Sequence, residues 1–380
     1  MDLKLLLAFA MVLSLALVGC TSPEPPRKPA GELPDLVVME AYVTHYLEHD
    51  NTTKQYKETH SFTTSVPPET RPSDWADMPV ENAKVKVFKG SIFVAAKDGK
   101  RIGGEFTEEN TIIKLNSQLE KKAEVKLADL GFFGTLVASH DALFASYGGK
   151  LVALDNDLNQ LSSVTLSGEM KKFAHDIIVY QDTAYVVDDV WEPILSFRVD
   201  VSNPSNMRVK ETIDMGGVNS HAGPQWLNPE LDQWVVARSW SVISGSSQSL
   251  YFYPLASGTE PRASKEVYTY NRPIGEDTAA SKSGLRVLAA TELAPAWVTI
   301  AKEDGVYVAL ADTTGDSISF TKQLRLSEGA EYPSIKKSGN KLFILLSNSL
   351  KVVDISGDPA VVMSQDFNQT YIDFDLITGQ

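Results

Sequence analysis

Short alternating runs of apolar and polar residues dominate this chain, and long helical periodicity is nearly absent. In these runs β-branched and aromatic residues alternate with polar ones, and turns rich in Gly, Asn, Asp and Pro separate them. The pattern predicts β-strands; typical examples are residues 84–88, 91–95, 142–147, 184–187, 234–237, 250–253, 285–288 and 341–346. The sequence therefore predicts an all-β protein.

The predicted strands recur as a repeating unit. Each unit has a strand, a turn with Gly, Asp or Asn, a more continuously apolar strand, and two further strands. The apolar strands begin near residues 91, 142, 184, 234, 285 and 341, about 42 to 57 residues apart. A period of this size with four short strands per unit is typical of β-propeller blades. We expect a β-propeller of six to seven four-stranded blades.

The two ends of the chain are expected to close the ring. Residues 36–43 and 56–62 have strand character and predict a hairpin, and the last strand, Tyr371–Ile377, is expected to pair with it. Pairing of N- and C-terminal strands would supply a seventh blade. It would also remove exposed sheet edges, which invite aggregation.

Two segments resemble a known repeat. Residues 194–206 (Ile-Leu-Ser-Phe-Arg-Val-Asp-Val-Ser-Asn-Pro-Ser-Asn) and 350–359 (Leu-Lys-Val-Val-Asp-Ile-Ser-Gly-Asp-Pro) are similar to the LVIVD repeats of secreted and surface propellers of bacteria and archaea, and residues 150–155 match in part. We expect Asp200 and Asp354 to accept hydrogen bonds from backbone amides of the following turn. The resemblance implies a propeller and no particular activity.

The amino terminus predicts a lipid anchor. A start with Lys4 leads into the apolar run Leu5–Val18, which is too short to span a bilayer comfortably as a helix. The run ends in Leu17-Val-Gly-Cys20, which resembles a bacterial lipobox. The resemblance implies acylation of Cys20, for example with palmitate, and removal of residues 1–19 as a signal peptide. The alternative is an ordinary secretory leader with a chance cysteine.

We expect a proline-rich tether between the anchor and the fold. Residues 20–35 form this segment, and residues 36–380 are predicted to form a single propeller domain. At ~3.1 Å per residue its proline-rich residues 21–34 would reach on the order of 40 Å when extended. The predicted localisation is the cell envelope: the periplasmic face of the outer membrane in an organism with two membranes, and the outward face of the cell membrane otherwise.

Charge and cysteine content exclude several function classes. The net charge of −14 argues against nucleic-acid binding, which needs clustered Lys and Arg. Cys20 is the only cysteine, so disulfides, thiolate zinc sites and cysteine nucleophiles are excluded from the rest of the chain. No Walker loop, dinucleotide fingerprint or Gly-x-Ser-x-Gly elbow occurs.

Ligands are expected over the central channel, at the face where the innermost strands begin. Alignment of the units brings the candidate ligand or metal residues to this face: His175, Asp176, Asp188, Asp189 and His221. Imidazole and carboxylate groups could bind a divalent metal or act as general acid and base. Alternatively, they tie blades together through hydrogen bonds from side chain to backbone.

A second histidine pair, His45 and His49, is not expected to share a metal. Its surroundings predict a strand, on which residues four apart are separated by roughly 13 Å.

Aromatic residues concentrate between positions 191 and 270 and predict a binding surface. The candidate residues of this surface are Trp191, Arg238 and Trp240. Exposed Trp and Tyr are common anchors for protein or glycan partners. The alternative for aromatic residues such as Trp226 and Trp234 is packing between sheets.

Together these patterns favour a lipid-anchored binding or interaction platform at the cell envelope. Its membrane contact would be the N-terminal lipid, and its partner a protein or glycan. The alternative is a metal-dependent hydrolase or lactonase-like propeller enzyme that uses the histidine and aspartate residues at the channel mouth. A bound divalent metal as cofactor would favour the enzyme.

Overall fold

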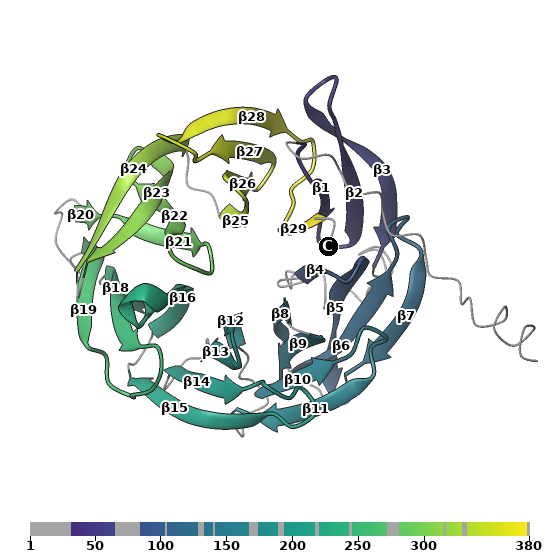
Figure 1. The fold of residues 1–380 in the computed structure, drawn as a ribbon, viewed down its shortest axis with the longest axis horizontal. Helices are drawn as coiled ribbons and strands as arrows, with labels where there is room; N and C mark the ends of the chain where they lie inside the picture. Colours follow the sequence, from purple (N-terminus) through teal and green to yellow (C-terminus); the bar gives the residue numbers. More distant parts are fainter. Residues whose placement is uncertain are drawn as a thin grey trace, which may run out of the picture.

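The computed structural model describes residues 32–64, 84–102, 105–127, 133–139, 141–166, 174–188, 194–216, 220–242, 245–271, 281–314, 317–328 and 333–377. Their strands form seven antiparallel sheets around a central axis (Figure 1), so the chain is a seven-bladed β-propeller. The predicted fold class is confirmed. The helical content of these ranges is one 3-10 turn, η3 (Pro229–Leu231). No helix within them has the length and apolarity needed to cross a membrane.

Six blades follow one another in chain order, each from its innermost to its outermost strand. Blade 2 consists of β4 (Lys84–Phe88), β5 (Ser91–Ile102), β6 (Glu105–Leu115) and β7 (Lys121–Lys126), and blade 3 of β8 (Phe133–Ser139), β9 (Ala142–Tyr147), β10 (Lys150–Leu154) and β11 (Gln160–Thr165). Blade 4 consists of β12 (Ala174–Tyr180), β13 (Thr183–Asp188), β14 (Ile194–Asp200) and β15 (Arg208–Gly216). Blade 5 has five strands, β16 (Ser220–Asn228), β17 (Gln233–Val242), β18 (Gly245–Pro254), β19 (Ala263–Asn271) and β20 (Ser281–Gly284). Blade 6 consists of β21 (Arg286–Ala290), β22 (Ala296–Lys302), β23 (Gly305–Thr314) and β24 (Ser317–Ser327), and blade 7 of β25 (Pro333–Ser338), β26 (Lys341–Leu346), β27 (Ser349–Asp354) and β28 (Ala360–Asp366).

Both ends of the chain contribute to the closing blade, as predicted. Its strands run in the order β29 (Asp373–Ile377), β1 (Asp35–Met39), β2 (Val43–Asp50) and β3 (Gln55–Thr63), with β29 innermost. The expected single strand over residues 36–43 is wrong in detail. The amide of Glu40 donates to the Val43 carbonyl at 2.8 Å, and this turn splits the run into β1 and β2. The N-terminus therefore supplies three strands of the closing blade.

One strand of the predicted repeat is misplaced. Residues 285–288 were expected to begin the apolar second strand of a unit, but β21 is the innermost strand of blade 6 and β22 is the second. The turn between them, residues 291–295, reads Thr-Glu-Leu-Ala-Pro and carries no Gly, Asn or Asp. Ser283 and Gly284, directly before residues 285–288, belong to β20, the extra outer strand of blade 5, and form no turn of blade 6.

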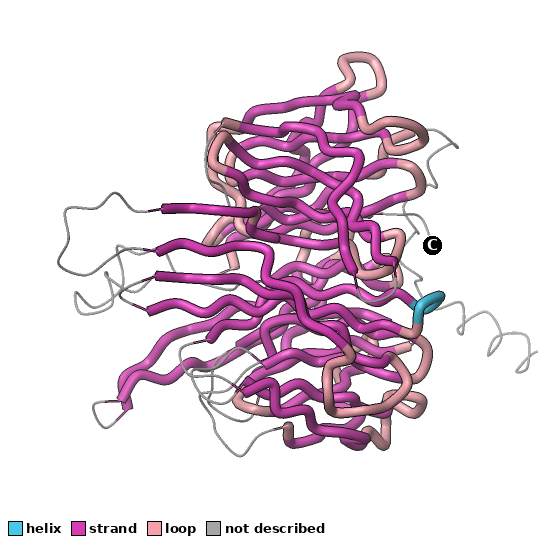
Figure 2. Tube along the Cα trace, turned by 90° about the vertical axis from the view of Figure 1, so that its left-hand side faces the viewer, coloured by secondary structure: helices cyan, strands magenta, loops and turns pink. Residues whose placement is uncertain are grey.

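The ring has two different faces. We call the face where the innermost strands begin the N face, and the face where they end the C face. Hairpins of blades 2 and 5 extend at the N face: β5 pairs with β6 from Ile92 to Ile102, whereas β4 pairs only with residues 91–95. Figure 2 shows strands that reach beyond the ring on the side away from the C-terminus. The N face therefore carries the longer projections.

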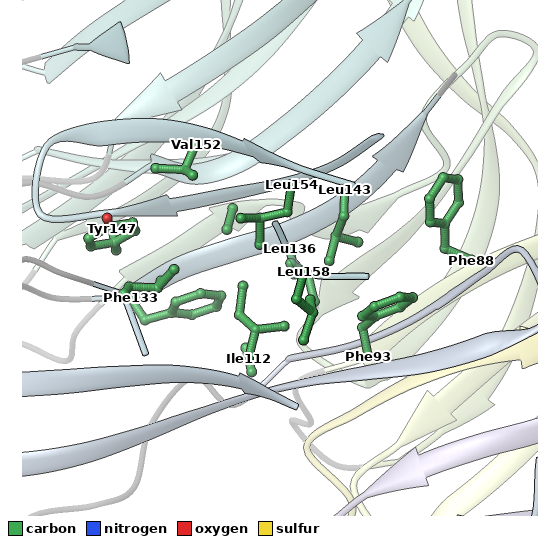
Figure 3. Packing of buried hydrophobic residues seen from close by; sticks show 13 residues of the cluster. Phe88, Phe93, Ile112, Phe133, Leu136, Leu143, Tyr147, Val152, Leu154 and Leu158 are labelled. Atoms are coloured by element: carbon green, nitrogen blue, oxygen red, sulfur yellow. The ribbon is translucent and has the colours of Figure 1, made fainter. Parts of the chain in front are cut away.

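Apolar side chains fill the spaces between neighbouring blades. Figure 3 shows the cluster between blades 2 and 3, where Phe88, Phe93 and Ile112 meet Leu143 and Leu154. All six residues of β9 are buried, as expected for a second strand covered on both faces. Each large apolar side chain buried in this way contributes about 1.5–3 kcal/mol. The packing joins neighbouring blades into one closed ring.

Turns between the third and fourth strands share one hydrogen bond, in which an Asp or Asn side-chain oxygen accepts from the backbone amide two residues later. Asp200 Oδ1 accepts from the Ser202 amide at 3.2 Å, and Asp354 Oδ1 accepts from the Ser356 amide at 2.8 Å, as expected from the two repeat-like segments. The same acceptor position is occupied in three further blades, by Asp50, Asn116 and Asp155. This side-chain-capped turn thus occurs in more blades than the two whose sequence resembles the repeat.

Acid is expected to weaken the turn at Asp354. The hydroxyl and amide of Ser356 and the ammonium of Lys341 lower the pKa of Asp354 from 3.8 to about 2. A carboxyl with a lowered folded-state pKa stabilises the fold above its unfolded pKa, and this contribution is lost as the pH falls from about 4 to 2. Asp354→Asn keeps an acceptor oxygen and does not titrate. The stability difference between wild type and variant, measured by urea denaturation, should therefore shrink on acidification; a difference independent of pH would contradict the assignment.

Candidate functional site

Two carboxylates of the C-terminal strand link the closing blade to blade 2 at the centre of the ring. Asp373 and Asp375 on β29 are only 7% and 6% exposed. Asp373 Oδ2 accepts from the Val85 amide at 3.0 Å, and Asp375 Oδ2 accepts from the Val87 amide at 2.8 Å. Buried backbone amides need an acceptor, so the carboxylates satisfy groups on the inner edge of β4.

Two lysines bring positive charge to these carboxylates. Lys86 Nζ lies 3.3 Å from Asp375 Oδ2. Burial opposes the charge of Lys336 on β25, but the carboxylates of Asp375, Asp373, Glu292 and Asp176 outweigh it and raise the pKa of Lys336. The centre of the ring therefore holds a mixed charged network, in which Lys336 stays protonated. Sequence reasoning singled out only Asp176 among these residues.

The candidate residues of blade 4 lie at the N face, where β12 begins and β13 ends. His175 sits in a β-bulge between Ala174 and Asp176, and Ala174 pairs with Asp188 at the end of β13. Asp176 is half-buried, and its Oδ1 accepts from the Ile177 amide at 2.9 Å. The side chains of His175 and Asp188, and Asp189 as a whole, lie outside the described residues.

The candidate residues of blade 5 lie at the same end of the adjacent blade. His221 on β16 is exposed and stands opposite Ser239, while Ser220 stands opposite Trp240. Arg238 on β17 is half-buried; its guanidinium donates to the Met215 carbonyl of β15 and lies 5.7 Å from the Tyr251 ring centre. Arg238 therefore links blade 5 to blade 4. The Trp240 side chain, Trp191 and Cys20 lie outside the described residues.

The structure thus brings β12 and β16, with the backbones of His175, Asp176 and His221, to neighbouring positions on the N face. Their role in ligand or metal binding stays a prediction. Among the side chains that the structure describes, no group of three or more His, Cys, Asp and Glu could hold a metal ion.

His45 and His49 lie on strand β2, as expected. His45 Nε2 is 2.9 Å from Glu40 Oε1, and its Nδ1 is 3.2 Å from Glu58 Oε2. The imidazole also meets the edge of the Tyr371 ring at 5.7 Å. These contacts place His45 in the packing of the closing blade.

Much of the aromatic sector packs between blades. Trp226 and Trp234 are fully buried, and Tyr253 packs against Trp234 with ring centres 5.9 Å apart. Trp234 Nε1 donates to Gln225 Oε1 at 2.7 Å, so its polar group is satisfied inside. For these residues the packing alternative is correct.

A buried cation joins blades 4 and 5 and was missed by sequence reasoning. Arg198 on β14 is 1% exposed. Its guanidinium donates to Glu211, to the Pro254 carbonyl and, at 3.0 Å, to the Gly258 carbonyl. It also lies 5.4 Å from the Trp234 ring centre. The sequence signal that could have indicated this buried cation is the arginine inside the apolar run 194–200.

Comparison with known proteins supports the fold and goes no further. No protein-family model matches this chain, and no curated protein matches it. Among solved structures, hydrazine synthase of Kuenenia stuttgartiensis is similar over 76% of this chain and 86% of that chain, with a TM-score of 0.52 and 11% sequence identity. Identity at this level shows a shared fold alone. The class that the fold defines is the seven-bladed β-propeller.

Proposed function

We propose that this protein is a lipid-anchored β-propeller of the cell envelope that acts as a binding platform. The observation that carries the proposal is the lipobox-like Leu17-Val-Gly-Cys20, followed by a proline-rich tether and then a closed ring. The segments similar to LVIVD repeats of surface propellers support the same location.

The ring suits a platform because its blades are packed together and its longer projections are on one face. Rigid scaffolds that position loops are a common basis of recognition surfaces. We assign partner binding to the N face, with Arg238, Trp191 and Trp240 as candidate contacts for a protein or glycan. The net charge of −14 favours basic or cation-bridged partners, although at physiological salt this preference acts only within roughly 8 Å.

Replacement of Cys20 tests the anchor. In cells that process bacterial lipoproteins, we expect the wild-type chain in the membrane fraction and a Cys20→Ser chain in the soluble extracytoplasmic fraction. The serine hydroxyl cannot form the thioether that carries the lipid, and a short apolar leader does not span the bilayer stably. Fractionation with metabolic labelling by a radioactive fatty acid is the measurement. Absence of label from the wild type, or equal labelling of Cys20→Ser, would contradict the proposal.

The metal-dependent hydrolase is the second candidate, favoured by the pairing that brings the strand ends carrying His175, Asp188 and His221 to one face. Purification without chelator and elemental analysis of wild type and of a His175→Ala/His221→Ala variant separates the two. About one metal per chain, lost in the variant, would favour the enzyme.

A further inference from the structure

We propose that the C face of the ring is turned toward the anchoring membrane, and that the N face is the surface offered to partners in the aqueous phase. The inference rests on the proposed lipid anchor at Cys20. It adds an orientation, which neither the sequence pattern nor the fold class supplies alone.

The chain joins the ring at the C face. Asp35, the first residue of β1, pairs with Ile377, the last residue of the innermost strand β29. The C-terminus marks this side in Figure 2, opposite the projecting strands. A tether that precedes β1 therefore leaves from the C face, close to the central axis rather than from the rim.

The root of the tether is fixed to the closing blade. Leu33 packs against its apolar cluster, and the Tyr56 hydroxyl donates to the Pro34 carbonyl at 2.8 Å. Asp35 Oδ1 accepts from the His49 amide at 2.9 Å, and Asp35 Oδ2 accepts from the Tyr46 hydroxyl at 3.2 Å. Burial raises the pKa of Tyr46, and so does the neighbouring Asp35 carboxylate, so the phenol remains a donor at neutral pH. The tether that precedes this fixed root thus comprises residues 21–32.

This length decides which face can reach the membrane. Twelve residues span at most about 40–45 Å when fully stretched, and about 37 Å in the extended conformation expected of a proline-rich segment at ~3.1 Å per residue. To bring the N face down, the tether would pass β2 and β3, about 10 Å, and then rise along the nine residues of β3, about 30 Å. Side chains at the rim add to this path. The path to the N face therefore uses the whole length of the tether before any residue reaches the bilayer, whereas the C face lies directly at the root of the tether.

The C face also offers two exposed leucines to the lipid surface. Leu231 after β16 and Leu293 after β21 are 37% and 42% exposed, and their loops are joined by the bridge between Leu227 and Leu293. The acidic neighbours Glu230 and Glu292 are exposed beside them. Charge therefore limits adhesion to an anionic bilayer, and the tether sets the orientation.

Single-cysteine variants of the lipidated full chain in vesicles test the inference. Glu303→Cys places a thiol on the N face, in the β22–β23 turn, and Asp358→Cys places one on the C face, in the β27–β28 turn; both positions are exposed. Acylation leaves Cys20 without a free thiol. We measure labelling by a maleimide carried on a large polyethylene glycol chain, relative to the same variants in the soluble Cys20→Ser background. Anchoring should slow Asp358→Cys several-fold and leave Glu303→Cys nearly unchanged.

A lengthened tether provides the matched control. A Gly/Ser insert that doubles the segment before Leu33 should remove most of the difference between the two positions, because the N face can then reach the membrane. Equal slowing at both positions, or stronger slowing of Glu303→Cys, would overturn the orientation while leaving the anchor in place. A chain that does not bind vesicles through Cys20 would overturn the anchor, and the orientation with it.

Discussion

Deletion of β29, by ending the chain after Thr370, is expected to abolish the folded monomer. β29 is the innermost strand of the closing blade, and Phe374 and Leu376 pack in one cluster with Leu36 and Phe343. Each such side chain contributes about 1.5–3 kcal/mol. With the lost β1 ladder, the sum approaches the whole stability of a typical domain, about 5–15 kcal/mol. Size-exclusion chromatography and urea denaturation measure the outcome.

Two matched changes separate ring closure from a general effect of altering the C-terminus. Removal of residues 378–380, which follow β29, should leave the unfolding midpoint unchanged. Asp373→Ala/Asp375→Ala should have an intermediate effect of about 1–3 kcal/mol for each buried amide left without an acceptor. A monomeric deletion variant with the wild-type midpoint would show that β29 does not close the ring.

Substitution of Arg198 by methionine is expected to lower the free energy of unfolding by about 3–5 kcal/mol, the usual cost of removing one partner of a buried ion pair. Methionine keeps much of the apolar volume and removes every donor. Glu211 and the carbonyls of Pro254 and Gly258 then lose their hydrogen bonds, and Trp234 loses its stacked cation. Urea denaturation followed by tryptophan fluorescence reports the change.

Arg208 supplies the control for Arg198. Its side chain is 76% exposed and pairs with Asp200 at 3.0 Å on the same blade. Exposed ion pairs contribute about 0–1 kcal/mol, so Arg208→Met should change little. Similar losses in both variants would mean that Arg198 acts through its charge alone, without the interblade contacts that the structure assigns to it.

Most of the fold was predictable because the apolar pattern of each unit indicates a blade, and the strand-like runs at the two ends of the chain indicate how the ring closes. Strongly apolar second strands such as β9 and β26 mark the blades, and the runs at 36–43 and 371–377 mark the closure. The strand near 285 was misplaced because residues 291–295 turn without a turn-forming glycine. The sequence resemblance found the side-chain-capped turn only twice, since it required the surrounding motif. The physical requirement is only an acceptor at the end of the third strand, which Asp50, Asn116 and Asp155 also meet.

The centre of the ring was less predictable. Asp373 and Asp375 alternate with Phe374 in a terminal strand, and that alternation was a usable signal of one polar side. Their partners on β4 and the nearby Lys336 come from other blades, so only the closed ring brings them together. Arg198 presents the same difficulty, because its acceptors Glu211 and Gly258 are 13 and 60 residues away in sequence.

The order of synthesis gives the closing blade a further consequence. β1 is made first and its inner neighbour β29 last, so almost the whole chain separates two strands that must pair. Contacts of such long sequence separation form late in folding, and until then the edge of β1 stays open. A chain cut short by a premature stop or by proteolysis lacks the strand that completes the ring. Closure of the ring therefore depends on the last strand to be synthesised: only a chain that includes β29 gains the closed form.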